Sequence, residues 1–300
     1  MEANLAPANP AYHTVTGQTI WSYVYFGSYP QSEVNEADLT PAIKQADYTE
    51  TSDAWVNGTK YRRLRKEDAA NPEFFGNSDF RYFLWEPIKW RVMQNNEKTL
   101  FVIADIGLDC KMFHDIKAYN TFETITWETC SLRHWLNNDF YQTAFNSSEQ
   151  KAIVQQEVIN HAVPEFHYHA DCGNNTNDFI YLLSIPELRN TIYGFWDARI
   201  DWEHKRNKKA NRIMKASNYA HARGVWLRPD NHKDYSCHWW LRSICDDHKC
   251  GVHMMNLGDI FEVGYSYNYF PREAVVPVLH LDLLSNCWTM ETKEEKRQLP

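Results

Sequence analysis

The sequence predicts an α+β domain built from short strands, two helices and long loops. Of the 300 residues, 43% are hydrophobic and 15% are aromatic, which is enough apolar material for a sizeable core. Strand-like runs do not alternate with helical patterns as regular βαβ units, which argues against a doubly wound parallel sheet. Long loops separate the elements, and loops held on a rigid scaffold often carry function.

Composition narrows the function classes. The formal net charge is −8 and the isoelectric point is near 5.9, which argues against nucleic acid as the main partner. No stretch approaches the roughly 20 apolar residues of a membrane span. The first twenty residues lack the pattern of a signal peptide, so we expect a cytoplasmic protein, or one that reaches a phage particle or cell surface by another route. The seven cysteines, an odd number, predict mostly free and buried thiols.

The first third of the chain predicts strands. Residues 1–19 are a loose lead-in, residues 20–26 have strand character, and residues 27–30 predict a turn. Residues 32–80 are polar and predict a long excursion with one or two short strands. Residues 83–93 and 99–104 predict a hairpin with Asn95 and Asn96 in its turn.

Two helices follow in the sequence. Leu132, Trp135 and Leu136 fall at helical spacing, and Thr129 or Ser131 can cap this helix. A second short helix is expected to start at Ser147 or Ser148. Residues 178–183 then predict one buried strand, and residues 186–188 predict the start of a short helix. After residue 215 the sequence predicts loops and short strands.

A local cluster of potential zinc ligands is formed by His161, His167, His169 and Cys172. Zinc sites use these residue types at tight spacing, but this spacing matches no standard zinc pattern. The neighbouring Pro164 and Gly173 suggest a polar loop instead.

A second cluster lies near the C-terminal end. Cys245 and Cys250 could close a small disulfide loop or supply two zinc ligands, or they could be two independent thiols. A calcium site is another possibility, with oxygen ligands from Asp246, Asp247, Asn256 and Asp259. The spacing of these residues is not that of an EF-hand loop. The same residues could contact a partner, and we expect neither a metal nor another cofactor.

Patterns typical of catalysis are missing from the sequence. It has no Gly-x-Ser-x-Gly elbow and no Gly-rich phosphate loop, and no carboxylate pair stands out as an acid/base couple. We expect Arg242 to form a structural ion pair or hydrogen bonds to carbonyl oxygens, and anion binding is the alternative. Core positions are expected for the tryptophans at 85, 90, 127, 135, 226, 239 and 240.

The most distinctive segment, residues 245–272, lies between the apolar blocks Trp239–Ser243 and Ala274–Leu284. It is rich in Tyr, Asn and Asp, the composition of binding surfaces, because Tyr supplies rigid contact area and small polar residues supply adaptable hydrogen bonds. The candidate ligand-binding residues are Asp246, Asp247, His248, His253, Asn256, Asp259, Phe261, Tyr265, Ser266, Tyr267, Asn268, Tyr269 and Phe270. We expect this face to bind a protein or a glycan.

Short motifs between residues 20 and 284 resemble, in order, those of a widespread bacterial domain of unknown function. They are Phe26–Gln31, Pro87–Val92, Ser131–Asn137 with Phe140, Tyr141, Ala144 and Phe145, then Asp178–Ser184, Asn218–Gly224, Cys237–Ser243 and Ala274–Leu279. That family is similar to the C-type-lectin-like fold in the variant of the formylglycine-generating enzymes. The resemblance implies one domain over residues 20–284, with a lead-in over 1–19 and a tail over 285–300.

Some relatives of that family are variable proteins of diversity-generating retroelements, in which adenine changes scatter Asn codons in the final segment. All thirteen candidate binding residues can be reached from an Asn codon in this way, whereas Lys249, Met254, Met255 and Glu262 cannot and would be fixed scaffold positions. The resemblance therefore implies a non-enzymatic ligand-binding protein with a hypervariable surface.

Two alternatives stay open. One is an oxidoreductase or another enzyme on the same fold, although the catalytic cysteines of formylglycine-generating enzymes have no motif match here. The other is a structural module of a phage or cell-surface assembly. The chain also departs from the family in residues 276–278, Val-Pro-Val in place of the usual Arg-Pro-Ala.

Overall fold

The predicted hairpin lies at the centre of the largest sheet. In the computed structural model, β6 (Phe80–Asn95) pairs antiparallel with β7 (Thr99–Ala104). Ile88, Trp90 and Val92 alternate along β6 and are fully buried. The hairpin predicted for residues 83–104 is confirmed. Its turn begins one residue later than expected, because Asn95 is the last residue of β6 and pairs with Leu100, which leaves residues 96–98 as the turn.

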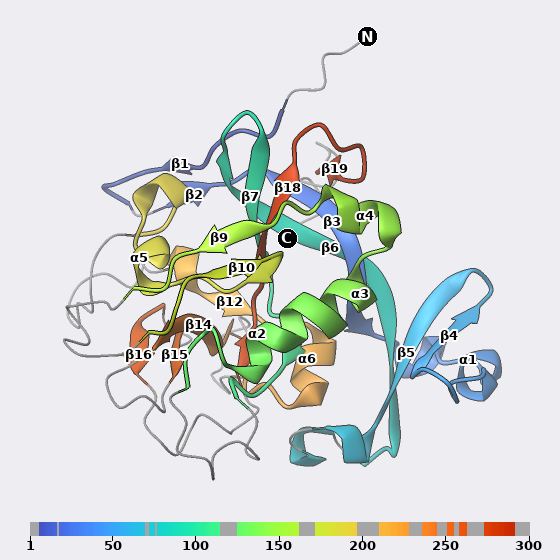
Figure 1. The fold of residues 1–300 in the computed structure, drawn as a ribbon. Coiled ribbons are helices and arrows are strands. Elements are labelled where there is room, and N and C mark those ends of the chain that lie inside the picture. Colours follow the sequence, from blue (N-terminus) through green and yellow to red (C-terminus); the bar gives the residue numbers. More distant parts are fainter. Residues whose placement is uncertain are drawn as a thin grey trace.

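The structure describes residues 6–16, 18–69, 72–75, 77–114, 125–161, 172–196, 210–227, 236–244, 251–254, 258–262 and 273–291. Within these ranges the chain is a mixed α+β structure with mostly antiparallel sheets and few helices (Figure 1). No helix in the described ranges has the length and apolar character needed to cross a membrane.

The largest sheet has eight strands. Its main order is β11 (Ile180–Tyr181), β18 (Val278–Asp282), β7, β6, β3 (Tyr23–Glu33) and β19 (Thr289–Met290), and β5 (Thr59–Arg65) with β4 (Asp53–Val56) continues from β6. β19 lies in the segment expected to be a tail. Lys89 and Glu291 add a 2.6 Å ion pair there, so the chain up to residue 291 packs against the sheet.

Two expectations for the first thirty residues are wrong. The predicted turn at residues 27–30 does not form, because β3 runs through it with irregular register on both sides of Ser28–Pro30. Gly27 has φ = 65°, a conformation that glycine adopts readily. The lead-in also holds a small hairpin of β1 (Ala11–Tyr12) and β2 (Thr19–Ile20).

A second sheet has five strands. Its order is β16 (Ile260–Glu262), β15 (Gly251–Met254), β14 (Trp239–Ile244), β17 (Ala274–Val275) and β8 (Asp109–Cys110), and β14 and β17 run parallel. Two further pairs are β9 (Gln156–Val158) with β10 (Thr176–Asp178), and β12 (Met214–Lys215) with β13 (Ser236–Cys237).

The first predicted helix exists but begins at a different cap. α2 (Ser131–Trp135), a π-helical turn (Leu136–Phe140) and α3 (Tyr141–Ala144) follow one another. The cap is Cys130, whose Sγ accepts a hydrogen bond from the Arg133 amide, whereas the Thr129 hydroxyl turns back to Thr126. Leu132 is buried, as its helical spacing predicted.

The second predicted helix is α4 (Ser147–Ala152), and Asn146 caps it. The Asn146 side chain accepts hydrogen bonds from the amides of Ser148 and Glu149, and Glu149 accepts one from the Asn146 amide. The expected start at Ser147 or Ser148 is therefore confirmed, and Asn146 is the cap that precedes it. The predicted helix start at residues 186–188 is confirmed as α5 (Ile185–Leu188).

Two further expectations need correction. The single strand expected at residues 178–183 is divided between β10 and β11, because the Asn137 side chain accepts hydrogen bonds from the amides of Phe179 and Ile180 at the junction. The chain after residue 215 holds an additional helix, α6 (Asn218–Arg223), capped by Ser217. Short 3₁₀ turns lie at Glu36–Asp38, Lys66–Asp68, Pro72–Phe75, Thr191–Tyr193 and Ala210–Arg212.

Residues 41–65 form an arm that projects from the rest of the molecule (Figure 1). It consists of α1 (Pro41–Gln45) and the β4–β5 hairpin, consistent with the one or two strands expected in residues 32–80. A small separate core is formed by Ile43, Tyr48 and Ala54 of the arm together with Tyr82 of β6. A much larger apolar cluster fills the body and includes four fully buried tryptophans, Trp90, Trp127, Trp239 and Trp240. Trp85, Trp135 and Trp226 are only partly buried.

Candidate functional site

The predicted binding segment, residues 245–272, lies mostly outside the described residues. Of its candidate residues, Asp246, Asp247, His248, Asn256, Tyr265, Ser266, Tyr267, Asn268, Tyr269 and Phe270 are not among the described ones. The backbone of His253 lies in β15 and that of Phe261 in β16, and the two residues are cross-strand partners. Asp259 lies just before β16 and is partly buried.

The two ends of this segment are fixed in the core. β14 precedes it and β17 follows it, and Trp239 of β14 pairs with Ala274 of β17 in parallel register. Every residue of both strands is buried. The segment therefore connects two neighbouring strands of the sheet, and it also supplies β15 and β16 to that sheet.

Arg242 has a structural role next to this segment. Its guanidinium pairs with Glu187 and donates hydrogen bonds to the carbonyl oxygens of Leu182 (2.7 Å) and Ile159 (3.2 Å). The interpretation of Arg242 as an ion-pair and carbonyl contact is confirmed. It joins β14 to the N-terminal end of α5, where Glu187 also completes the capping box of Ser184.

Five cysteines lie in the described ranges, and they are thiols rather than disulfide partners. Cys110, Cys130 and Cys237 are buried, and Cys172 and Cys287 are partly buried. Burial raises the pKa of the Cys130 thiol to about 12, and it also raises the pKa of Cys110 and Cys237. These three thiols stay protonated at neutral pH, so they give no support for a thiolate nucleophile.

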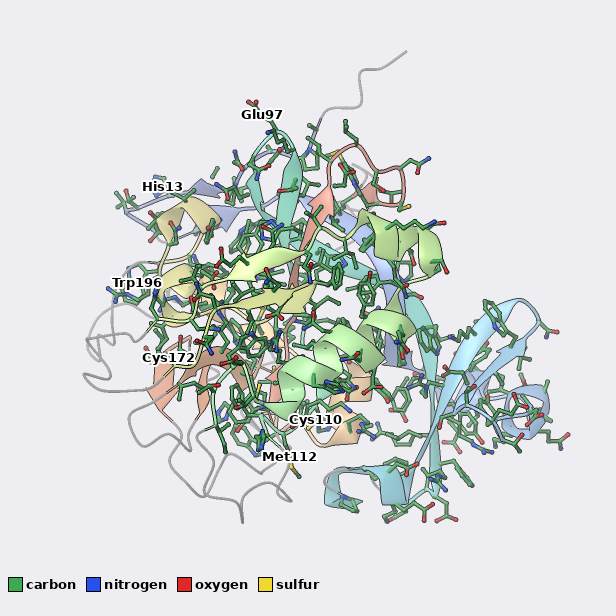
Figure 2. All side chains as sticks on the ribbon, viewed as in Figure 1. His13, Glu97, Cys110, Met112, Cys172 and Trp196 are labelled. Carbon is green, nitrogen blue, oxygen red and sulfur yellow. The ribbon has the colours of Figure 1, made fainter. Side chains whose placement is uncertain are left out.

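Most of the predicted metal ligands lie outside the described residues. In the described ranges no three His, Cys, Asp or Glu side chains are grouped in a way that could hold a metal ion. His167, His169, Cys245 and Cys250 lie outside those ranges, as do Asp246, Asp247 and Asn256. Cys172 and Trp196 lie at the end of the molecule away from the arm (Figure 2).

A polar cavity that the sequence did not predict lies between the arm, α2–α3 and α6. It has a volume of about 210 Å³, and we call it the Asp109 cavity. Its ionisable and phenolic lining residues come from five separate elements and the adjoining loop; they are Tyr29, Arg62, Asp109, Lys111, Asp139, Tyr219 and Arg223. Trp135, Phe140 and Thr143 complete the wall.

Asp109 is the buried centre of this cavity. Its carboxylate accepts a 2.6 Å hydrogen bond from the Tyr29 hydroxyl and one from the Cys110 amide, and it lies 3.4 Å from Arg223 Nε. Burial alone would raise the pKa of Asp109, but the charges of Lys111 and Arg223 outweigh it and hold the pKa below its usual value. Asp109 is therefore ionised at neutral pH.

The tyrosines of the cavity are neutral. Burial raises the pKa of Tyr29 well above its usual value, and the Asp109 charge adds to the shift. Burial also raises the pKa of Tyr219, again with Asp109 as the next contribution. Both phenols act as hydrogen-bonding groups at neutral pH, and the Tyr219 oxygen accepts from Arg62 Nη1 at 3.3 Å.

An open groove of about 950 Å³ has one lining residue, Thr143, in common with the cavity. One wall of the groove is the arm, where Trp55 is 70% exposed and pairs across the hairpin with Lys60. The Lys60 amine lies 3.3 Å from the centre of the Trp85 ring. Gln142 and Thr143 of α3 also line the groove and are exposed.

Residues 96–283 match the family described as Domain of unknown function (DUF6273). This match covers more than half of the chain. The chain belongs to the DUF6273 family. No curated protein and no solved structure matches the sequence of this chain. The DUF6273 match includes β14, β17 and the whole segment 245–272, and the motifs at 26–31 and 87–92 precede it.

The Asp109 cavity draws on both parts of the chain. Asp109, Lys111 and Arg223 lie inside the DUF6273 match, whereas Tyr29 and Arg62 precede it. Sequence reasoning missed the cavity because its residues are dispersed over the chain. One available signal was Asp109 itself, a charged residue that directly follows the apolar residues Ile106 and Leu108.

Proposed function

We propose that this DUF6273 protein is a non-enzymatic ligand-binding protein, in which a C-type-lectin-like scaffold presents residues 245–272 to a protein or glycan. One observation carries the proposal. The segment lies between β14 and β17, which are neighbouring and fully buried strands. A rigid base of this kind allows the surface residues to change while the core stays in place.

The composition of the segment supplies the contacts. Tyr265, Tyr267, Tyr269 and Phe270 are the proposed anchors, because aromatic side chains bury large areas with few rotatable bonds. The polar residues of the segment supply hydrogen bonds. Diversification by a retroelement is the proposed origin of this composition.

The test compares binding with stability. The triple variant Tyr265→Ala, Tyr267→Ala and Tyr269→Ala is screened beside the wild-type protein on glycan arrays and surface-protein libraries. We expect the wild type to select one ligand class, and the triple variant to lose it with an unchanged melting temperature. A large fall in the melting temperature would show that these tyrosines belong to the core, and the proposal would then be wrong.

Population sequencing tests the origin separately. We expect substitutions between residues 245 and 272 to be confined to the positions whose residues can be reached from an Asn codon by adenine changes, with Lys249, Met254, Met255 and Glu262 unchanged. A uniform segment across the population would remove the retroelement from the proposal and leave an ordinary ligand-binding domain.

A further inference from the structure

We propose that the open groove beside the arm is a second binding site, which takes a neutral oligosaccharide with one of its pyranose rings stacked on Trp55. This inference is independent of the function proposed for residues 245–272, because the two involve different residues. It depends on the exposed ring of Trp55, on the hydroxyl and amide groups that line the groove, and on the balance of the charges there.

Trp55 is an accessible ring on a fixed support. In the described part of the chain no ring stacks on it, and it is 70% exposed. Asp53, which lies on the same face of β4, accepts a 3.0 Å hydrogen bond from Trp85 Nε1. Lys60, the cross-strand partner of Trp55, lies over the Trp85 ring. Trp55, Lys60 and Trp85 therefore form a row across β4, β5 and β6.

The groove also offers many neutral hydrogen-bonding groups. Gln142 and Asn146 line it with exposed primary amides. The Asn146 side-chain oxygen accepts hydrogen bonds from two backbone amides of α4, which leaves its NH₂ group for a ligand. Hydroxyl groups are supplied by Ser28, Thr59, Thr143 and Thr289. A pyranose ring has C–H groups on its faces, which pack on the negative face of an indole, and hydroxyl groups at its rim.

The charges of the groove cancel. Among the described residues that line it, Lys60 and Glu149 are the only ones with an amine or a carboxyl group. The Lys60 amine lies 3.5 Å from the Asp53 carboxylate, and Glu149 accepts a 2.8 Å hydrogen bond from the Asn146 amide. Because both charges already have partners in the protein, the groove favours a neutral sugar over a phosphate or a uronic acid.

A proline-rich peptide is the competing occupant, because such peptides dock in aromatic grooves. Those grooves present several accessible rings, whereas most of the rings in this groove are covered. Lys60 covers the Trp85 ring, and the buried rings of Phe26 and Phe145 stack on each other with their centroids 5.0 Å apart. One accessible ring beside many amide and hydroxyl groups favours a sugar chain.

Cellohexaose is the probe, since its ring substituents are all equatorial and its ring faces carry only C–H groups. It is titrated into the 300-residue protein by calorimetry, with hexagalacturonate and decaproline in parallel series. We expect cellohexaose alone to bind. Trp55→Ala should weaken its binding by about tenfold or more, because it removes the stacking ring. Trp55→Tyr should retain binding.

Ile20→Ala is the matched control, because Ile20 is 76% exposed on β2 and does not line the groove. It should bind cellohexaose as the wild type does, and both alanine variants should keep the wild-type melting temperature. A second measurement uses the wild-type protein alone. Cellohexaose should protect Trp55, and not Trp226, from hydroxyl-radical oxidation measured by mass spectrometry.

The triple variant Tyr265→Ala, Tyr267→Ala and Tyr269→Ala separates this site from the function proposed above, and it should bind cellohexaose as the wild type does. Loss of cellohexaose binding in that variant would place the sugar on residues 245–272 and overturn the groove. The proposal is also overturned if cellohexaose neither binds nor protects Trp55, if Trp55→Ala binds it as tightly as the wild type, or if hexagalacturonate or decaproline binds as tightly as cellohexaose.

Discussion

The Tyr29 hydroxyl donates a 2.6 Å hydrogen bond to the Asp109 carboxylate, and this contact joins the two large sheets through β3 and β8. Both side chains are buried. Hydrogen bonds to charged groups contribute more than neutral ones, and a buried carboxylate that loses a donor keeps its full desolvation cost.

Tyr29→Phe removes that donor and little else. We expect the free energy of unfolding to fall by about 1.5–3 kcal/mol. Urea unfolding monitored by tryptophan fluorescence measures the change. A loss too small to detect would mean that water or another side chain replaces the phenol.

Arg242→Met leaves Glu187 without its cation and two carbonyl oxygens without a donor. We expect a loss of about 3 kcal/mol or more, the range for breaking a buried pair. Arg65→Met is the control, because Arg65 is 52% exposed and pairs with Glu67 and Asp68 at the surface. The control should unfold at the wild-type urea midpoint; equal losses in the two variants would contradict the structural role of Arg242.

Asn146→Ala tests the cap of α4. It removes the cap from two amides and should cost about 1 kcal/mol. Ser147→Ala, one residue later, should change stability by less than about 0.5 kcal/mol. Thermal unfolding of the two variants compares these losses, and the reverse order would contradict the assignment of Asn146 as the cap.

Gly27→Ala combines two penalties. The backbone has φ = 65°, and an added Cβ would lie 2.4 Å from Phe145 Cε1 and 2.9 Å from the Ala144 carbonyl oxygen. We expect a loss of about 3 kcal/mol or more from strain and overpacking together. Gly58→Ala carries only the backbone penalty, since φ is 81° and no atom lies within 4 Å, so about 1 kcal/mol is expected. Equal losses in calorimetric scans would show that β3 moves away from α3 at little cost.

His280 makes stability depend on pH. Burial lowers its pKa from 6.5 to about 4, and its ring stacks on Phe101 with the centroids 4.4 Å apart. Between these pKa values the unfolded chain binds a proton that the folded chain does not. Stability is therefore complete above about pH 6.5 and falls as the pH approaches 4.

The His280 contribution to that loss is on the order of 3 kcal/mol, at about 1.4 kcal/mol per pKa unit. His280→Gln should remove it, so the wild type should lose more stability than the variant between pH 7 and pH 4. Parallel pH profiles of unfolding would contradict this assignment.

The sequence predicted those elements in which local pattern and tertiary context agree. The β6–β7 hairpin has alternating apolar residues and an Asn residue in its turn, and α2 has its apolar residues on one face. The turn predicted at residues 27–30 was wrong because Gly, Ser and Pro are typical of turns, while here a bulged strand packs against Phe145. The cap predicted for α2 was wrong because several neighbouring side chains could serve, and only the backbone angles decide among them.

The two candidate sites differ in the same way. Residues 245–272 form one contiguous run, so composition alone drew attention to them. The Asp109 cavity is assembled from residues as distant as Tyr29 and Arg223, and no local pattern joins them. A dispersed polar cluster becomes visible only when the sheets are placed together.

The pairing of β3 with β19 has a consequence for folding kinetics. Tyr25 pairs with Thr289, so β3 gains this neighbour only after residue 289 has left the ribosome. Contacts so distant in sequence slow folding, because the intervening chain must be ordered first. We therefore expect the backbone groups at that edge of β3 to stay unpaired in the nascent chain until then, and thus accessible to a chaperone.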